Sequence, residues 1–213
     1  MECDDHRTHT RRDMLHTILS MPATFALASY AGLRLSVMTP AAFAQVPALP
    51  PTPACTDADD VTPRQTEGPF YKPRSPERTS LLAPGSTGTP IVLTGYVLSR
   101  RCQPIARALL DFWHADAQGH YDNEGVRFRG HQFADEAGRY RLESIAPGLY
   151  PGRTRHFHVK VQAPNRPVLT TQLYFPDEPR NAQDRIFNPA LLMAMHDTAD
   201  GKLARFHFIL DIS

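Results

Sequence analysis

The chain has 213 residues, a length that fits one domain. Its 23 lysines and arginines stand against 22 aspartates and glutamates, so the formal net charge of +1 excludes a strongly basic surface for nucleic acid or an anionic membrane. The 20 prolines and 12 glycines are scattered among short apolar runs, which favours many turns between short strands over long helices.

The N-terminus carries the features of an export signal. Residues 10–15 read Thr-Arg-Arg-Asp-Met-Leu, which resembles a twin-arginine motif, and a mildly apolar stretch follows. Residues 42–44 read Ala-Phe-Ala, a suitable cleavage site. Arg34 interrupts the apolar stretch, so no stable membrane span is expected in the mature chain. We therefore expect residues 1–44 to direct export to the periplasm or beyond and to be removed; an uncleaved extension is the alternative.

An extended arm or linker is predicted at residues 45–63, which are rich in proline, alanine and aspartate. Cys55 in this arm and Cys102 are the two cysteines of the mature chain. Exported proteins tend to pair their cysteines, so a disulfide between these two is favoured over two free thiols.

The remaining residues, 64–213, are predicted to form a mainly β fold. Turn sequences, such as those at 135–138 and 146–148, separate the apolar runs, and residues 184–195 are predicted to be a short helical or irregular excursion. No repeated helix pattern separates the apolar runs of this region. This favours a single-domain β-sandwich of short antiparallel strands with long connecting loops. The predicted strands are Ile91–Ser99, Ala108–Ala115, Arg139–Glu143, Arg155–Gln162, Leu169–Phe175 and Lys202–Ile212.

Two histidines lie two residues apart on the strand predicted at 155–162. Side chains alternate across a strand, so His156 and His158 project from the same face. Two neutral imidazoles on one face are suited to binding a metal ion. Tyr150 and Arg153 precede them in the same short run, which adds a phenol and a guanidinium to the candidate site.

Four motifs occur in order along the chain: Gln65–Tyr71, the spacing of Gly95, Leu110-Asp111-Phe112 and Gly119-His120-Tyr121, the histidine pair, and Thr171–Phe175. Together they resemble the motifs of the intradiol ring-cleavage dioxygenases, a family that includes catechol 1,2-dioxygenases and protocatechuate 3,4-dioxygenases. The resemblance spans roughly residues 62 to 212. It departs from the family at Cys102, where a small residue is usual, and in the short stretch between Tyr150 and His156. The helical dimerisation region of catechol 1,2-dioxygenases has no counterpart.

The resemblance implies a β-sandwich that holds one Fe(III) per chain, with Tyr121, Tyr150, His156 and His158 as ligands and hydroxide as the fifth. Residue chemistry agrees with this. A phenol with a pKa of about 10 is protonated in neutral water, and a bound trivalent cation favours its phenolate. Hard anionic oxygen together with imidazole suits iron. Tyr150 matches the tyrosine that substrate displaces in this family.

The resemblance also implies a reaction in which O2 cleaves a catechol-type ring between its two hydroxylated carbons and gives a muconate-type diacid. Both oxygen atoms enter the product, so the enzyme would be an oxidoreductase. Arg153 matches an arginine that stabilises negative charge on the substrate ring. The implied catalytic residues are Arg153, Gln172 and Tyr150, and the implied pocket residues are Trp113, Gly68 and Pro69.

Several alternatives stay open at the level of sequence. The chain could be an inactive β-sandwich binding module, or a cupin-like metalloenzyme whose His-x-His pair is completed by a carboxylate or a third histidine. Hydroxyquinol, a lignin-derived catechol and protocatechuate are all possible substrates, and a homo-oligomer is compatible with the sequence. The candidate partners of a protocatechuate carboxylate are Arg127, Arg129 and Arg155. The histidines expected at the surface or around the ligands are His114, His120, His131, His196 and His207.

Overall fold

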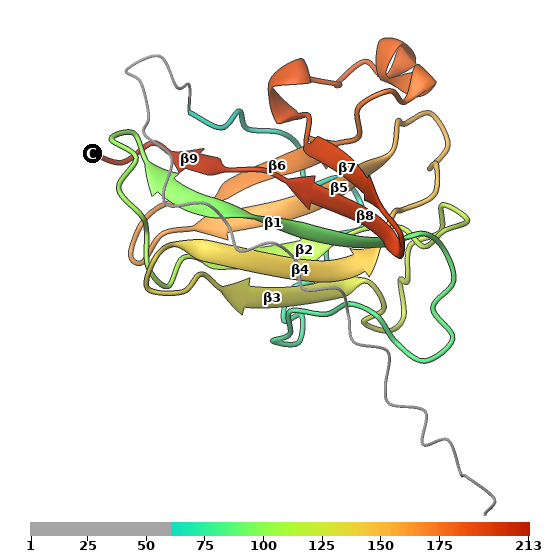
Figure 1. Ribbon diagram of the computed structural model, residues 1–213, viewed down its shortest axis with the longest axis horizontal. Helices are drawn as coiled ribbons and strands as arrows, with labels where there is room; N and C mark the ends of the chain where they lie inside the picture. The colour runs from blue at the N-terminus through green and yellow to red at the C-terminus, as the bar shows by residue number, and fades with distance from the viewer. Residues whose placement is uncertain (1–60) are drawn as a thin grey trace, which may run out of the picture. The chain divides into compact units, whose positions relative to one another are not determined.

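The computed structural model describes residues 61–213, which fold into two β-sheets (Figure 1). The leader predicted at 1–44 and most of the predicted arm lie outside this range. The strands of the first sheet, in spatial order, are β4 (Arg139–Ile145), β1 (Pro90–Ser99), β8 (Gly201–Arg205) and β7 (Ala194–Thr198), with β9 (Phe208–Leu210) also paired to β1. The strands of the second sheet are β3 (Arg129–Phe133), β2 (Leu109–Trp113), β5 (His156–Gln162) and β6 (Leu169–Tyr174). The predicted β-sandwich is confirmed.

The two sheets enclose one apolar core because alternate side chains of each strand point inward. In β5, Phe157 and Val159 are fully buried in this core, and Leu93 of β1 reaches it from the other sheet. Burying a side chain of this size contributes roughly 1.5–3 kcal/mol. The same alternation sends His156 and His158 to the opposite face of the second sheet.

That outer face of the second sheet places chemically active side chains in register. His158 is paired with Trp113 of β2 on one side and with Gln172 of β6 on the other, and His156 is paired with Tyr174. The segment before β1 crosses this face: the Gln65 N–H donates to the carbonyl oxygen of Thr170 at 2.9 Å. The pairing of three strands therefore fixes the spacing of these side chains before any ligand binds.

All six predicted strands are present, but the strand predicted at 202–212 is divided into β8 and β9. Both pieces run parallel to β1, whereas antiparallel pairing was expected throughout. The interruption falls at Phe206, whose carbonyl oxygen lies 1.7 Å from where a Cβ on Gly95 would be. The chain thus passes over β1 at the residue that has no side chain, and the Tyr140 hydroxyl donates to the same carbonyl at 3.0 Å.

The sequence analysis missed two strands and gave the excursion at 184–195 only in outline. Strands β3 and β7 are edge strands of five residues each, so neither carries a long apolar run. Between β6 and β7 the chain forms two short 3-10 helices, η1 (Pro179–Gln183) and η2 (Pro189–Leu191), and each begins with a proline. Within residues 61–213, no helix has the length and apolar character needed to cross a bilayer.

Cys102 lies in the turn after β1, where it is buried and forms a disulfide. Cys55, the partner predicted from the sequence, lies outside the described residues, so this pairing stays a prediction.

Replacing both cysteines by serine is expected to lower the free energy of unfolding by about 2–4 kcal/mol, because the bridge restricts the unfolded chain. Thermal unfolding measures this loss, and two titratable thiols in the folded, exported wild-type protein would contradict the pairing.

Candidate metal centre

Tyr121 reaches the site from a tight turn that follows β2. The Asp116 carboxylate accepts hydrogen bonds from the N–H groups of Gln118 and His120, both at 2.9 Å, which fixes the turn. Gly119 has a φ of +86°, and a Cβ there would lie 2.1 Å from the carbonyl oxygen of Leu149. A glycine is therefore needed for the turn to pack against the loop that leads to Tyr150.

The two histidines and Tyr121 converge on one point of the outer face. The Nε2 atoms of His156 and His158 are 3.0 Å apart, and the Tyr121 hydroxyl oxygen lies 3.4 Å from His156 Nε2. Both imidazoles are buried. The Tyr150 ring stands edge-on to the Tyr121 ring, with 5.9 Å between their centroids. All four predicted ligands are thus neighbours.

The hydrogen-bond partners of the two histidines indicate which ring nitrogens carry a lone pair. His156 Nδ1 lies 2.6 Å from the Thr154 carbonyl oxygen, which can only accept, so His156 carries its proton on Nδ1 and turns a lone pair at Nε2 toward His158. His158 Nδ1 is buried and has no hydrogen-bond partner within the described residues. One polar group of this pair therefore stays unsatisfied whichever nitrogen of His158 holds the proton.

A second proton does not solve this problem, because burial and then the Arg153 charge lower the pKa of His156 to about 4. Burial and then His156 lower the pKa of His158 well below its ordinary value. A metal ion held by the two Nε2 atoms, which are 3.0 Å apart, would accept the lone pair of each imidazole. The buried Nδ1–H of His158 would then be the one group without a partner among the described residues.

Tyr121 requires a cation to become a phenolate. Burial raises its pKa above the ordinary value, while the positive charges of Arg153 and Arg129 oppose that rise. The phenol therefore stays protonated unless a metal ion binds its oxygen and reverses the balance. Within residues 61–213, no group of three or more histidine, cysteine, aspartate or glutamate side chains is placed to hold a metal ion.

The segment 65–71 lies against both Tyr121 and His158. The Phe70 ring stacks on Tyr121 with 4.3 Å between centroids and 14° between planes, and its edge meets Tyr150 at 5.3 Å. A Cβ on Gly68 would lie 3.4 Å from His158 Cε1, so the backbone passes directly over that imidazole. Pro69 is exposed beside it.

Trp113 lies behind the site rather than at its opening. Its indole is stacked on His158 with 4.9 Å between centroids and 7° between planes, and only 1% of the residue is exposed. Tyr71 packs against the other part of the indole at 4.8 Å. In the described structure Trp113 supports the His158 ring and fixes its orientation, and its role in the wall of a substrate pocket stays a prediction.

Arg153 is held between two side chains beside the histidines. Its Nε donates to Asp184 Oδ2 at 2.8 Å, and its Nη2 donates to Gln172 Oε1 at 2.5 Å. Gln172 is fully buried and donates through Nε2 to the Thr66 carbonyl oxygen at 2.9 Å. The predicted catalytic residues Arg153 and Gln172 are therefore in direct contact with each other.

Of the three arginines considered as partners for a substrate carboxylate, Arg129 already donates to backbone carbonyls and Arg127 lies next to two carboxylates. Arg129 is 2% exposed, and its guanidinium donates to the carbonyl oxygens of Phe70 at 2.7 Å and Asp122 at 2.9 Å. Arg127 is exposed and lines a hollow of about 260 Å³ beside Tyr121, with Asp116 and Asp122 in its wall. These carboxylates oppose the binding of an anion there.

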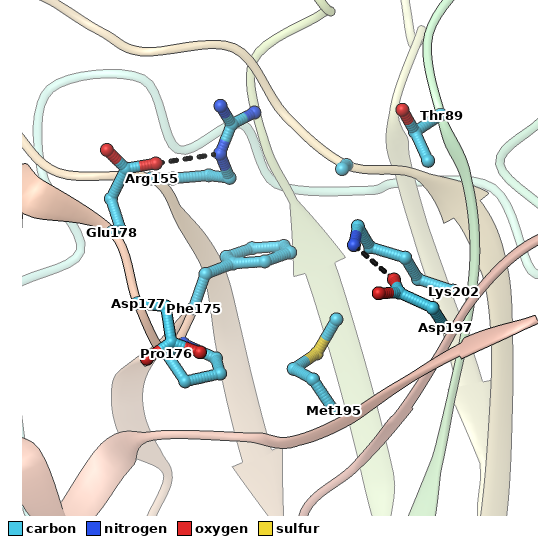
Figure 2. A pocket seen from close by; sticks show the side chains of 10 residues that line it. Thr89, Arg155, Phe175, Pro176, Asp177, Glu178, Met195, Asp197 and Lys202 are labelled. Atoms are coloured by element: carbon cyan, nitrogen blue, oxygen red, sulfur yellow. Dashed lines mark hydrogen bonds and ion pairs between the residues drawn. The ribbon is translucent and has the colours of Figure 1, made fainter.

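Arg155 lies in a separate pocket of about 440 Å³. Figure 2 shows its ion pair with Glu178 on one side of this pocket and the ion pair of Lys202 with Asp197 on the other. Phe175 lies between them. Neither the histidine pair nor the tyrosines line this pocket, so Arg155 faces away from the candidate metal site.

Within residues 61–213, the five histidines other than His156 and His158 lie outside the ligand cluster. His114, expected at the surface or around the ligands, is buried between the sheets, close enough to the two histidines to affect the pKa of His158. Its two nitrogens contact the Ser144 hydroxyl and the Ala115 carbonyl, both at 2.7 Å. Burial lowers its pKa to about 3, so it stays neutral. His131 contacts Ser75, and His207 accepts a hydrogen bond from the Tyr96 N–H. His120 and His196 are the two exposed histidines among the described residues.

Three residues of the site were missed by the sequence analysis: Phe70, Arg129 and Asp184. Phe70 was within a quoted motif but received no role. Arg129 was considered only as a partner of substrate, and its pairing opposite Trp113 depends on the unpredicted strand β3. Asp184 accepts the N–H of Ile186, two residues later, at 3.1 Å, a local pattern that the sequence does allow. Its contact with Arg153 is long-range.

These features define a β-sandwich protein with a cluster of two histidines and two tyrosines on the outer face of one sheet. The family profile described as "Dioxygenase" matches residues 66–211. The chain belongs to the intradiol ring-cleavage dioxygenase family.

Known relatives agree with this assignment. The dioxygenase domain of a dioxygenase and carbohydrate-binding protein fusion from Streptomyces sp. SirexAA-E is 56% identical, with a TM-score of 0.71 over 72% of this chain and 100% of that one. Hydroxyquinol 1,2-dioxygenase of Rhodococcus opacus is 30% identical over 57% of this chain and 49% of that protein. The protocatechuate 3,4-dioxygenase beta chain of Burkholderia cepacia is 33% identical over 47% of this chain and 50% of that protein. The chain thus spans about half the length of these two curated relatives.

Proposed function

We propose that the chain is an Fe(III)-dependent enzyme that cleaves a catechol-type ring between its two hydroxylated carbons and incorporates both atoms of O2. The observation that carries the proposal is the convergence of Tyr121 oxygen, His156 Nε2 and His158 Nε2, with Arg153 held beside them. Tyr150 completes the ligand set from the facing loop. Two phenolates and a hydroxide would neutralise Fe(III), one ion per chain.

Ferric iron, when bound, supplies the Lewis acidity that makes a coordinated catecholate reactive toward O2. Tyr150 lies on the loop at the edge of the cluster and is partly exposed, so it can give up its place to substrate and accept one hydroxyl proton at its phenolate oxygen. The permanent charge of Arg153 stabilises electron density that builds on the ring. Phe70 and Trp113 hold Tyr121 and His158 in place.

Oxygen uptake with a panel of catechols tests this function. The purified protein is expected to be red-brown, because phenolate bound to Fe(III) absorbs visible light, and to consume one O2 for each ring that is opened to a diacid. The reaction needs no external reductant. A pale protein with a metal but without this absorption would favour the cupin-like alternative, and a coloured protein that turns over none of the catechols would favour the binding module.

The same panel tests the substrate class. Arg129 donates to backbone carbonyls and Arg155 is paired with Glu178, so neither offers a free cation to a ring carboxylate. We expect kcat/KM for catechol and hydroxyquinol to exceed that for protocatechuate by about 10- to 100-fold, because a carboxylate would lose solvent without gaining a partner. Equal kcat/KM values for protocatechuate and catechol would contradict this expectation.

A further inference from the structure

The carboxylate of Asp184 is the buried partner of Arg153. Only 2% of the Asp184 side chain is exposed, against 18% of the Arg153 side chain, and Asp184 Oδ2 lies 2.8 Å from Arg153 Nε. Asp184 lies just after η1, whereas Arg153 lies on the loop before β5. The contact therefore joins two segments that are distant in sequence, and water cannot take the place of the carboxylate.

Asp184 is itself fixed by backbone donors. Its Oδ2 accepts the N–H of Thr154 at 2.9 Å, and its Oδ1 accepts the N–H of Ile186 at 3.1 Å. Both oxygens are thus oriented by groups that cannot rotate. Because a carboxylate can accept several hydrogen bonds at once, the same side chain also receives the guanidinium in a charge-assisted contact.

Gln172 holds the other side of the guanidinium. Its Oε1 accepts from Arg153 Nη2 and also from the Tyr174 hydroxyl at 3.1 Å, while its amide nitrogen is held by the Thr66 carbonyl. Two of the three guanidinium nitrogens are therefore occupied from opposite sides. Within residues 61–213, Nη1 makes no hydrogen bond and remains available to a bound molecule.

We propose that Asp184 is a positioning residue, which together with Gln172 fixes the plane of the Arg153 guanidinium so that its charge acts on the ring of a bound catechol. The inference rests on the role proposed above for Arg153 and extends it to a residue that touches neither ligand nor substrate. Arginine side chains have many rotamers, so an arginine on a loop needs such a clamp to keep its charge in one place.

The matched substitution is Asp184→Asn, which keeps the shape of the side chain and one oxygen acceptor but removes the charge. We expect kcat to fall by about 10- to 100-fold with KM changed less than about threefold, because the clamp serves charge that develops during reaction. The control is Glu178→Gln, which breaks the neighbouring ion pair with Arg155 in the pocket of Figure 2 and should leave kcat unchanged.

A double-mutant cycle separates positioning from a general structural role. If Asp184 acts through Arg153, adding Asp184→Asn to the Arg153→Ala variant should change kcat by less than about twofold. If Asp184 only stabilises the fold, the two effects should multiply and the loss of thermal stability in Asp184→Asn should account for the lost activity. That multiplicative result would overturn the proposal.

A measurement independent of turnover uses the full chain loaded with Ga(III), a diamagnetic trivalent ion, and labelled with nitrogen-15. The Arg153 Nε–H is expected to exchange slowly with solvent in the wild type and in Glu178→Gln, and at least about tenfold faster in Asp184→Asn, because a hydrogen bond must open before exchange. Unchanged exchange in Asp184→Asn would overturn the proposal. A wild type that cleaves no catechol would refute the proposed function, while the exchange experiment would still decide the clamp.

Discussion

Replacing His158 by alanine is expected to lower the affinity for iron by more than about 100-fold, a larger loss than that caused by removing a residue that only supports a ligand. The purified variant should be pale and should show no oxygen uptake with any catechol. The reason is geometric: His158 Nε2 lies 3.0 Å from His156 Nε2, so the substitution removes one of the two imidazoles that face each other in the proposed site.

Two tyrosine variants distinguish the ligand that is expected to stay bound from the ligand that substrate is proposed to displace. Tyr121→Phe should also weaken iron binding, because Tyr121 is packed into the site by Phe70. Tyr150→Phe should retain iron and change the colour, since we propose that Tyr150 is the ligand that substrate displaces. Metal content and visible spectra measure these effects, and His196→Ala, a histidine on the exposed edge strand β7, is the matched control. Equal colour and activity in all three site variants would refute the ligand assignment.

Replacing Arg153 by alanine is expected to leave iron bound and to lower kcat by about 100- to 1,000-fold, the scale of removing one preorganised electrostatic group. Arg153→Lys should restore only part of this loss. A lysine ammonium cannot reach Asp184 and Gln172 through separate nitrogens and still present a charge to the substrate, as the planar guanidinium does.

Steady-state kinetics and metal analysis together test the Arg153 assignment. The matched control is Arg139→Ala, which removes an arginine from an exposed ion pair with Asp135, where both side chains are about half exposed. This control should retain both iron and turnover, because exposed ion pairs contribute little. Wild-type kcat in Arg153→Ala would show that Arg153 is an ordinary charged residue of the loop.

The β-sandwich could be predicted from local sequence patterns. The strands that were missed or wrongly joined share a cause, which is that local patterns do not report contacts between distant residues. Short apolar runs between turn sequences located β1, β5 and β6, which are buried along most of their length. The edge strands β3 and β7 have only five residues each and carry no such run. The break at Phe206 depends on how closely its carbonyl approaches Gly95, and a contact between distant residues leaves no periodic signal.

The sequence predicted those parts of the candidate site that are formed by residues close together in the chain. His156 and His158 share a face because of strand periodicity, and the four motifs of the family supplied both tyrosines. The residues that hold these groups were not predictable in the same way. Arg129 and Asp184 act through contacts with segments about 60 and 30 residues away, so their roles require the fold itself.

The position of β1 has a consequence for the order in which the chain folds. β1 is the first strand along the chain, yet two of its partners, β8 and β9, are the last strands. Ile91 of β1, for example, is paired with Lys202 of β8. Parallel pairing between such distant segments is slow, because the entropy of closing the loop is lost before the contacts form. The first sheet therefore cannot be completed during synthesis until β8 and β9 have been made, whereas β2, β3, β5 and β6, the sheet that carries His156 and His158, can assemble earlier.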